Sequence, residues 1–146
     1  MAALLATLFT LLVPKQHIAV APTVSPTTVK AGAKVSLFVD VMPDAGIHVY
    51  APGAKDYQPI AVTITPRAEV TIGQTVYPKS EMWSFDGESV PVFQKPFRLT
   101  REVTIAKSAK AGTKLTVTGR VDYQACDDRV CFIPASLPVS WTIDVK

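Results

Sequence analysis

The chain has 146 residues, 48% of them hydrophobic and 18% charged, so it can bury the core of one domain and does not have the composition of a disordered chain. Its net charge is only +3, and its 15 Lys and Arg residues are scattered rather than clustered, which argues against a nucleic-acid partner. Twelve prolines against seven glycines, with many Val and Thr residues, favour strands and turns over helices.

The first 21 residues predict a leader for export. Residues 1–13 form an uncharged apolar run, too short for a membrane span of about 20 residues but suited to the apolar region of a secretory signal. Ala19-Val20-Ala21 is a small-residue cleavage pattern, so we expect residues 22–146 to form the mature domain. The alternative is a buried first strand, because no Lys or Arg precedes the run and Pro22 would follow the cut. Export would place the chain where a disulfide can persist.

Beyond this leader, apolar residues recur at every second position, as in half-buried strands. Five such stripes occupy residues 35–41, 60–64, 97–105, 115–123 and 137–145. Turn signals rich in Gly and Pro separate the stripes, and no window of helical period reaches a dozen residues. The pattern therefore predicts an all-β domain, an immunoglobulin-like antiparallel β-sandwich of seven to nine short strands.

Two segments between the stripes carry aromatic side chains. In residues 46–53, His48 and Tyr50 point to the same face of a predicted strand, where each can be a core or edge residue with a satisfied polar tip. Residues 77–95 contain Trp83 and Phe85 without clear alternation. They indicate either a long loop that covers another part of the molecule or a pair of short strands.

Cys126 and Cys131 are the only cysteines, with four residues between them and strand-like sequence on both sides. They predict a hairpin around residues 127–130, in which facing Cα atoms about 4.5–5.5 Å apart would suit a disulfide. A disulfide that closes a loop of about six residues contributes only about 2 kcal/mol, against about 4.7 kcal/mol for a hundred-residue loop. The pair therefore favours exchange chemistry over a structural cross-link.

The charges near the pair distinguish the two sulfurs. Asp127 and Asp128 lie beside Cys126 and oppose formation of its thiolate, whereas Cys131 is farther from both acids. On charge alone, Cys131 is the better candidate for the sulfur that meets a partner. Thiol-disulfide exchange needs no cofactor, only a thiolate, a disulfide and access.

Other chemistries have weaker support. The two cysteines together with His17 and His48 lack the ligand spacing of a zinc site. A Cys–His nucleophile has no third orienting residue that the sequence identifies. A metal chaperone that uses Met42, His48 and Met82 has no spacing to support it.

The sequence Tyr-Gln-Ala-Cys-Asp-Asp-Arg-Val-Cys-Phe-Ile-Pro at residues 123–134, followed by Leu-Pro-Val-Ser-Trp at 137–141, resembles the N-terminal periplasmic domain of the thiol:disulfide interchange protein DsbD. Residues 46–53 and 77–97 are similar to that domain in the same order, so the resemblance spans most of residues 17–146. It implies an immunoglobulin-like sandwich with one redox-active disulfide. Such a domain takes reducing equivalents from a thioredoxin-like domain and passes them to oxidised periplasmic partners.

The resemblance also implies roles for individual residues. Cys131 would form the mixed disulfide and Cys126 would resolve it, while Phe85 would cap the pair against stray oxidation. His48 and Tyr50 fall where the family has aromatic residues near the site, and His48 departs from that pattern. The spacing also departs, because well-known members have one more residue between the cysteines.

Full-length DsbD continues into a membrane-embedded section and a thioredoxin-like domain, whereas this chain ends at Lys146. We therefore expect a piece of a longer protein or a free-standing relative, with a thioredoxin-like donor. The prediction is a periplasmic thiol-disulfide oxidoreductase component without cofactor or metal. The alternative is a non-catalytic exported binding module, in which the disulfide only pins one hairpin.

Overall fold

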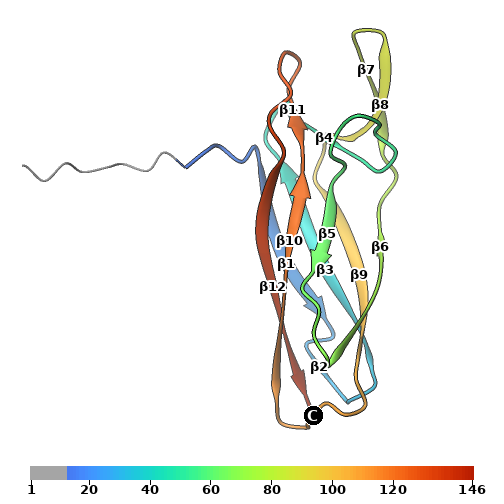
Figure 1. Cartoon of the computed structure of the whole chain (residues 1–146), viewed down its shortest axis with the longest axis vertical. Coiled ribbons are helices and arrows are strands. Elements are labelled where there is room, and N and C mark those ends of the chain that lie inside the picture. The colour runs from blue at the N-terminus through green and yellow to red at the C-terminus, as the bar shows by residue number, and fades with distance from the viewer. Residues whose placement is uncertain (1–12) are drawn as a thin grey trace, which may run out of the picture.

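The computed structural model describes residues 13–146, and residues 1–12 of the expected leader lie outside that part. The described residues form twelve β-strands and no helix, so they include no helix that could cross a membrane. The strands build two sheets that pack face to face and a third, smaller sheet at one end of the long axis (Figure 1).

The first sheet is wholly antiparallel in the order β1-β3-β9-β6. Its strands are β1 (Ile18–Ser25), β3 (Lys34–Pro43), β9 (Phe97–Ile105) and β6 (Val70–Val76). The predicted alternation holds along β3, where Val35, Leu37, Val39 and Val41 are each at most 1% exposed.

The second sheet has the order β2-β12-β10-β5. Its strands are β2 (Thr28–Val29), β12 (Ala135–Val145), β10 (Lys114–Tyr123) and β5 (Ala61–Ile64). The long β10–β12 hairpin runs in register from Lys114↔Asp144 to Tyr123↔Ala135, and the loop after Tyr123 carries the two cysteines. Only the short β2 pairs in parallel, with the end of β12.

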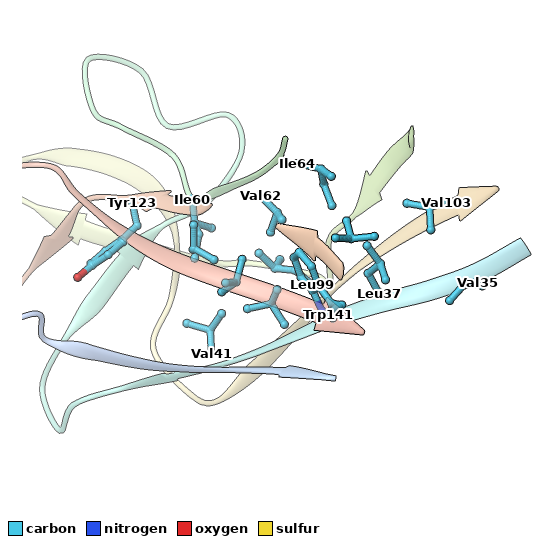
Figure 2. Close-up of a cluster of buried hydrophobic side chains, with 14 of the residues drawn as sticks. Val35, Leu37, Val41, Ile60, Val62, Ile64, Leu99, Val103, Tyr123 and Trp141 are labelled. Carbon is cyan, nitrogen blue, oxygen red and sulfur yellow. The ribbon is translucent and has the colours of Figure 1, made fainter. Parts of the chain in front are cut away.

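The core lies between these two sheets, as Figure 2 shows for Leu37 and Leu99 of one and Val62 and Trp141 of the other. Trp141 Nε1 donates a hydrogen bond to the Phe38 carbonyl, 2.9 Å away, and so joins the two sheets. This packing confirms the predicted immunoglobulin-like sandwich.

Arg101 interrupts the apolar stripe of β9 because its guanidinium has partners inside the sandwich. Its Nη1 donates to the Val62 carbonyl at 2.9 Å and to Thr75 Oγ1 at 2.7 Å. Arg101 is half-buried, and these two bonds compensate in part for the lost hydration of its guanidinium, whose Nε has no hydrogen-bond partner among residues 13–146. The exception to the alternating pattern is therefore a second tie between β9 and its neighbours.

The third sheet, β11-β4-β8-β7, positions the cysteines. Its strands are β11 (Ala125–Cys126), β4 (His48–Tyr50), β8 (Glu88–Phe93) and β7 (Glu81–Phe85). Asp86 and Gly87 join β7 to β8 with φ values of 49° and 81°, the left-handed pair that a two-residue type I′ hairpin requires. Residues 77–95 therefore contain a pair of strands rather than a long loop, and this cap hairpin (residues 81–93) projects at the same end of the molecule as the cysteine loop (Figure 1).

The domain boundary expected at residue 21 falls inside β1. Ile18 is 7% exposed, and residues 18–21 pair with Pro43, Met42, Val41 and Asp40 of β3. A cut after Ala21 would remove four of the eight pairs that β1 makes with β3. Residues 18–21 thus form part of β1 in this structure, and the leader over residues 1–21 stays a prediction.

Candidate functional site

One face of the third sheet gathers the residues of the site. Val49 in β4 points into the main core, so its neighbours His48 and Tyr50 point to the opposite face. Cys126 of β11 pairs directly with His48, and Val92 of β8 pairs with Tyr50. Side chains of directly paired residues lie on the same face of a sheet. Strand pairing therefore brings residues separated by nearly 80 positions into one cluster.

The two cysteines face each other across an antiparallel bridge, and both are free thiols. Cys126 is fully buried, whereas Cys131 is exposed. The hydroxyl of Tyr50 lies 2.7 Å from the sulfur of Cys126 and 3.2 Å from that of Cys131. A phenol has one proton to donate, so it can donate to one sulfur while it accepts from the other thiol. The structure is thus that of a dithiol bridged by a buried tyrosine.

Burial makes Cys126 a weak acid. Its removal from water, with a smaller contribution from its hydrogen bond to Cys131, raises the pKa of the Cys126 thiol to about 12. The charge of Asp127 acts in the direction expected from the sequence, but it is the smallest of these causes. Burial also raises the pKa of the Tyr50 hydroxyl, so Cys126 and Tyr50 are both neutral at pH 7. Access therefore separates the two sulfurs more sharply than the neighbouring charges do.

The turn between the cysteines is built by Asp127. Its Oδ1 accepts hydrogen bonds from the backbone amides of Arg129 and Val130, at 2.8 and 2.7 Å. These two bonds hold the pKa of the Asp127 carboxyl below its usual value. After the turn, the Phe132 amide donates to the Ala125 carbonyl at 2.9 Å and continues the hairpin. Cys131 thus sits on a short, well-bonded loop.

An apolar groove opens beside Cys131. Its volume is about 640 Å³, and its walls are residues 14–17 on one side and residues 130–136 on the other. His17 stacks on Phe132 with ring centroids 3.7 Å apart, which anchors one wall to the other. Ile133 is 82% exposed and offers its side chain at this groove. The groove therefore adjoins the accessible sulfur.

The expected cap residue lies at the outer end of an aromatic stack. Phe85 stacks on Trp83 at 5.1 Å, and Trp83 in turn stacks on the ring of His48 at 4.2 Å. Trp83 packs against the cluster that contains Cys126, whereas Phe85 is 40% exposed at the outer end of the stack. Within the cap hairpin, Trp83 therefore covers His48, and Phe85 lies on the other side of Trp83.

Two other contributors were missed from the sequence. Tyr57 stacks on Tyr50 at 4.1 Å and closes the cluster from the loop after β4. Asp128, which the sequence suggested only as a charge near Cys126, accepts a hydrogen bond from His48 Nε2 at 3.0 Å. A three-residue strand and a surface acid give no pattern that would have identified either contact. Within residues 13–146, no group of three or more His, Cys, Asp or Glu side chains is placed to hold a metal ion.

These features define a class of protein, an immunoglobulin-like sandwich that carries a pair of free cysteines on a small accessory sheet. The profile of the family described as "Thiol:disulfide interchange protein DsbD, N-terminal" matches residues 15–140. The chain belongs to this family, as the cysteine hairpin predicted. No curated protein sequence matches the chain.

Two solved structures share the fold. The N-terminal periplasmic domain of ScsB from Proteus mirabilis is 14% identical with a TM-score of 0.56, over 92% of this chain and 49% of its own. This chain thus spans about half of the ScsB chain. The reduced N-terminal domain of DsbD from Neisseria meningitidis is 18% identical with a TM-score of 0.50, over 75% of this chain and 78% of its own. At these identities the likeness concerns the fold.

Proposed function

We propose that this domain exchanges thiols and disulfides with protein partners in the periplasm. The observation that carries this proposal is the unequal pair of free thiols, one exposed at Cys131 and one buried at Cys126, which share the Tyr50 hydroxyl. The family is part of thiol-disulfide reductase machinery, which supports the same kind of reaction. Reactive cysteines need a thiolate and an accessible sulfur, and Cys131 has the access.

The reaction proceeds in two balanced steps. The Cys131 thiolate attacks one sulfur of a partner disulfide, forms a mixed disulfide and releases the other partner sulfur as a thiolate. Cys126 then loses its proton and attacks the Cys131 sulfur, which closes Cys126–Cys131 and releases the second partner thiolate. The partner disulfide gains two electrons and, with two protons, becomes a dithiol. A thioredoxin-like dithiol reverses the sequence and restores the domain.

Tyr50 assists the second step. At neutral pH Cys126 is a protonated thiol, so it does not compete with Cys131 for the partner. In the dithiol the Tyr50 hydroxyl lies 2.7 Å from the Cys126 sulfur. From this position it would donate to that sulfur as it becomes a thiolate, once Cys131 is in the mixed disulfide. A hydrogen bond to the charged form lowers the pKa of that form. The same tyrosine therefore favours ring closure at the moment it is needed.

The groove beside Cys131 supports a protein partner over a small molecule. Its length along residues 130–136 suits an extended segment next to a partner cysteine, and the exposed Ile133 offers apolar contact area. The family's association with thioredoxin-like proteins supports a partner of that class as the donor. Oxidised periplasmic proteins are the proposed acceptors.

The first test is the reduction potential of the pair, measured by equilibration in glutathione buffers. A value between about −120 and −270 mV lies in the range of exchange proteins and supports the proposal. A value below about −300 mV marks a structural disulfide, and the alternative of a non-catalytic binding module would replace exchange.

The order of the two cysteines is tested by trapping. With a thioredoxin-like protein as the disulfide partner, Cys126→Ser should accumulate a mixed disulfide through Cys131, because no resolving thiol remains. Cys131→Ser should trap no partner, because Cys126 is buried. Equal trapping by both variants would contradict the assigned order. The double variant controls for non-covalent binding.

The cap is tested separately with Phe85→Ala. If Phe85 restricts access, this variant should react several-fold faster with a small oxidant such as oxidised glutathione. Met82→Ala is the matched control. Met82 is exposed on the same strand, but its side chain points to the opposite face of the sheet from Phe85. An unchanged rate for Phe85→Ala would remove its role as a gate and leave Trp83 as the covering residue.

A further inference from the structure

His48 occupies a junction between the cap hairpin and the cysteine loop. Its ring is 6% exposed and stacks on Trp83, while its Nε2 donates to the exposed carboxylate of Asp128 at 3.0 Å. Its other nitrogen, Nδ1, is buried without a hydrogen-bond partner among residues 13–146. The bond to Asp128 is therefore the polar contact that compensates this imidazole for its burial.

The hydrogen bond between Asp128 and His48 attaches the turn at residues 127–130 to β4. Asp127 satisfies amides of its own turn, so its bonds shape the loop without attaching it to another strand. Within the described part of the chain, Asp128 makes the one side-chain hydrogen bond or ion pair that joins this turn to another strand. The far end of the loop has separate support, because Phe132 bonds to Ala125 and stacks on His17.

We propose that His48 is a positioning residue of the exchange site, which holds the Cys131 loop against β4 through Asp128 and ties that position to the cap hairpin through Trp83. The proposal deepens the proposed function and rests on it. The imidazole is suited to both contacts, because it presents a flat face to Trp83 and an N–H at its edge to Asp128. Phenylalanine would keep only the face, and glutamine only the donor.

The consequence concerns the balance between dithiol and disulfide. The bond is present in the dithiol form, in which the loop places both sulfurs within reach of Tyr50. The proposal includes that this bond is weaker in the disulfide form, so removing it disfavours the dithiol and should shift the equilibrium towards the disulfide. A hydrogen bond of average net strength corresponds to about a fivefold change, or about 20 mV for a two-electron couple.

The test is a double-mutant cycle on the glutathione equilibrium of the full chain, with His48→Phe, Asp128→Ala and the two combined. Each single variant should shift the equilibrium about fivefold, and the double variant should shift it no further, because all three lack the same bond. Asp128→Asn, which keeps an acceptor oxygen for Nε2, should stay within about twofold of the wild type. Asp144→Ala is the matched control, since it loses an exposed ion pair between β12 and Lys114 of β10, at the end of that hairpin opposite the cysteine loop.

The link to the cap is tested by hydrogen exchange of the amides in residues 81–93. His48→Gln should speed this exchange, because it loses the ring under Trp83, whereas His48→Phe should leave it unchanged. If a His48 variant fails to fold, the two Asp128 variants still test the loop contact, because Asp128 is exposed. Unshifted equilibria in the single variants, or shifts that simply add in the double variant, would overturn the proposal.

The two proposals fail separately. A wild-type potential below about −300 mV would end the exchange function, yet the coupling between His48 and Asp128 would still be measured. A potential in the exchange range with no coupling would leave the function standing and remove His48 from it.

Discussion

The raised pKa of the Cys126 thiol and its burial predict very slow alkylation of this cysteine in the folded dithiol. At pH 8 a thiol with a pKa of 9.0 is about one-tenth thiolate, whereas one with a pKa of about 12 is about one ten-thousandth thiolate. Because iodoacetamide reacts with the thiolate, Cys126 in the folded dithiol should react about a thousandfold more slowly than in the denatured chain. Its complete burial adds to this protection.

The assay is time-resolved iodoacetamide labelling of the reduced wild-type protein, with the label located by mass spectrometry of peptides. Native protein should take its first label at Cys131, and protein in urea should label both cysteines at similar rates. Between pH 9 and 11 the rate at Cys126 should keep rising in the native protein, while it levels off in the denatured chain. A native rate at Cys126 within about tenfold of the denatured rate would refute the reasoning from burial.

Three further predictions follow from the site and the fold. Ile133→Ser should lower kcat/KM with a thioredoxin-like protein about tenfold, because an exposed apolar contact is lost, and should leave reduction of oxidised glutathione unchanged. Val76→Ser, which changes an exposed apolar residue outside the groove, should leave both rates unchanged. The free energy of unfolding of the reduced protein should keep its full Cys126 contribution below pH 9 and fall by about 1.4 kcal/mol per pH unit from pH 9 towards 12, because only the unfolded chain ionises Cys126 there. Urea titrations of Cys126→Ala should show a flatter dependence on pH. A chain that begins at residue 22 should unfold at markedly lower urea than one that begins at residue 14, because residues 18–21 pair with β3. Equal midpoints would show that these pairs add nothing to stability and would support a mature domain that begins at residue 22.

Much of the sandwich was predictable because its long strands repeat one simple constraint. In β3 and β12, every second side chain must leave water, so the sequence alternates over ten or more residues and reveals both the strand and its buried face. Arg101 breaks the apolar stripe of residues 97–105, but nothing in the sequence identifies its partners Val62 and Thr75.

The cap hairpin and β1 show where this reasoning weakens. Most side chains of β7 are exposed, so alternation carries little information there, and the turn residues Asp86 and Gly87 were the better signal. At the N-terminus, Ala19-Val20-Ala21 satisfies a cleavage pattern and a strand pattern equally well. In the structure these residues pair with β3, a partner that only the folded chain offers them, and cleavage after Ala21 stays a prediction.

The sequence by itself determined the all-β class, the cysteine hairpin and its resemblance to the DsbD N-terminal family, because these depend on local patterns and on spacing along the chain. Only the tertiary structure decided that Tyr50 bridges the two sulfurs, that Trp83 stacks between His48 and Phe85, and that His48 bonds to Asp128. Those contacts arise where β4, three residues long, pairs with β11 on one side and β8 on the other. A strand that short has too few residues for a periodic signal, and its partners are fixed by how the rest of the sandwich folds around it.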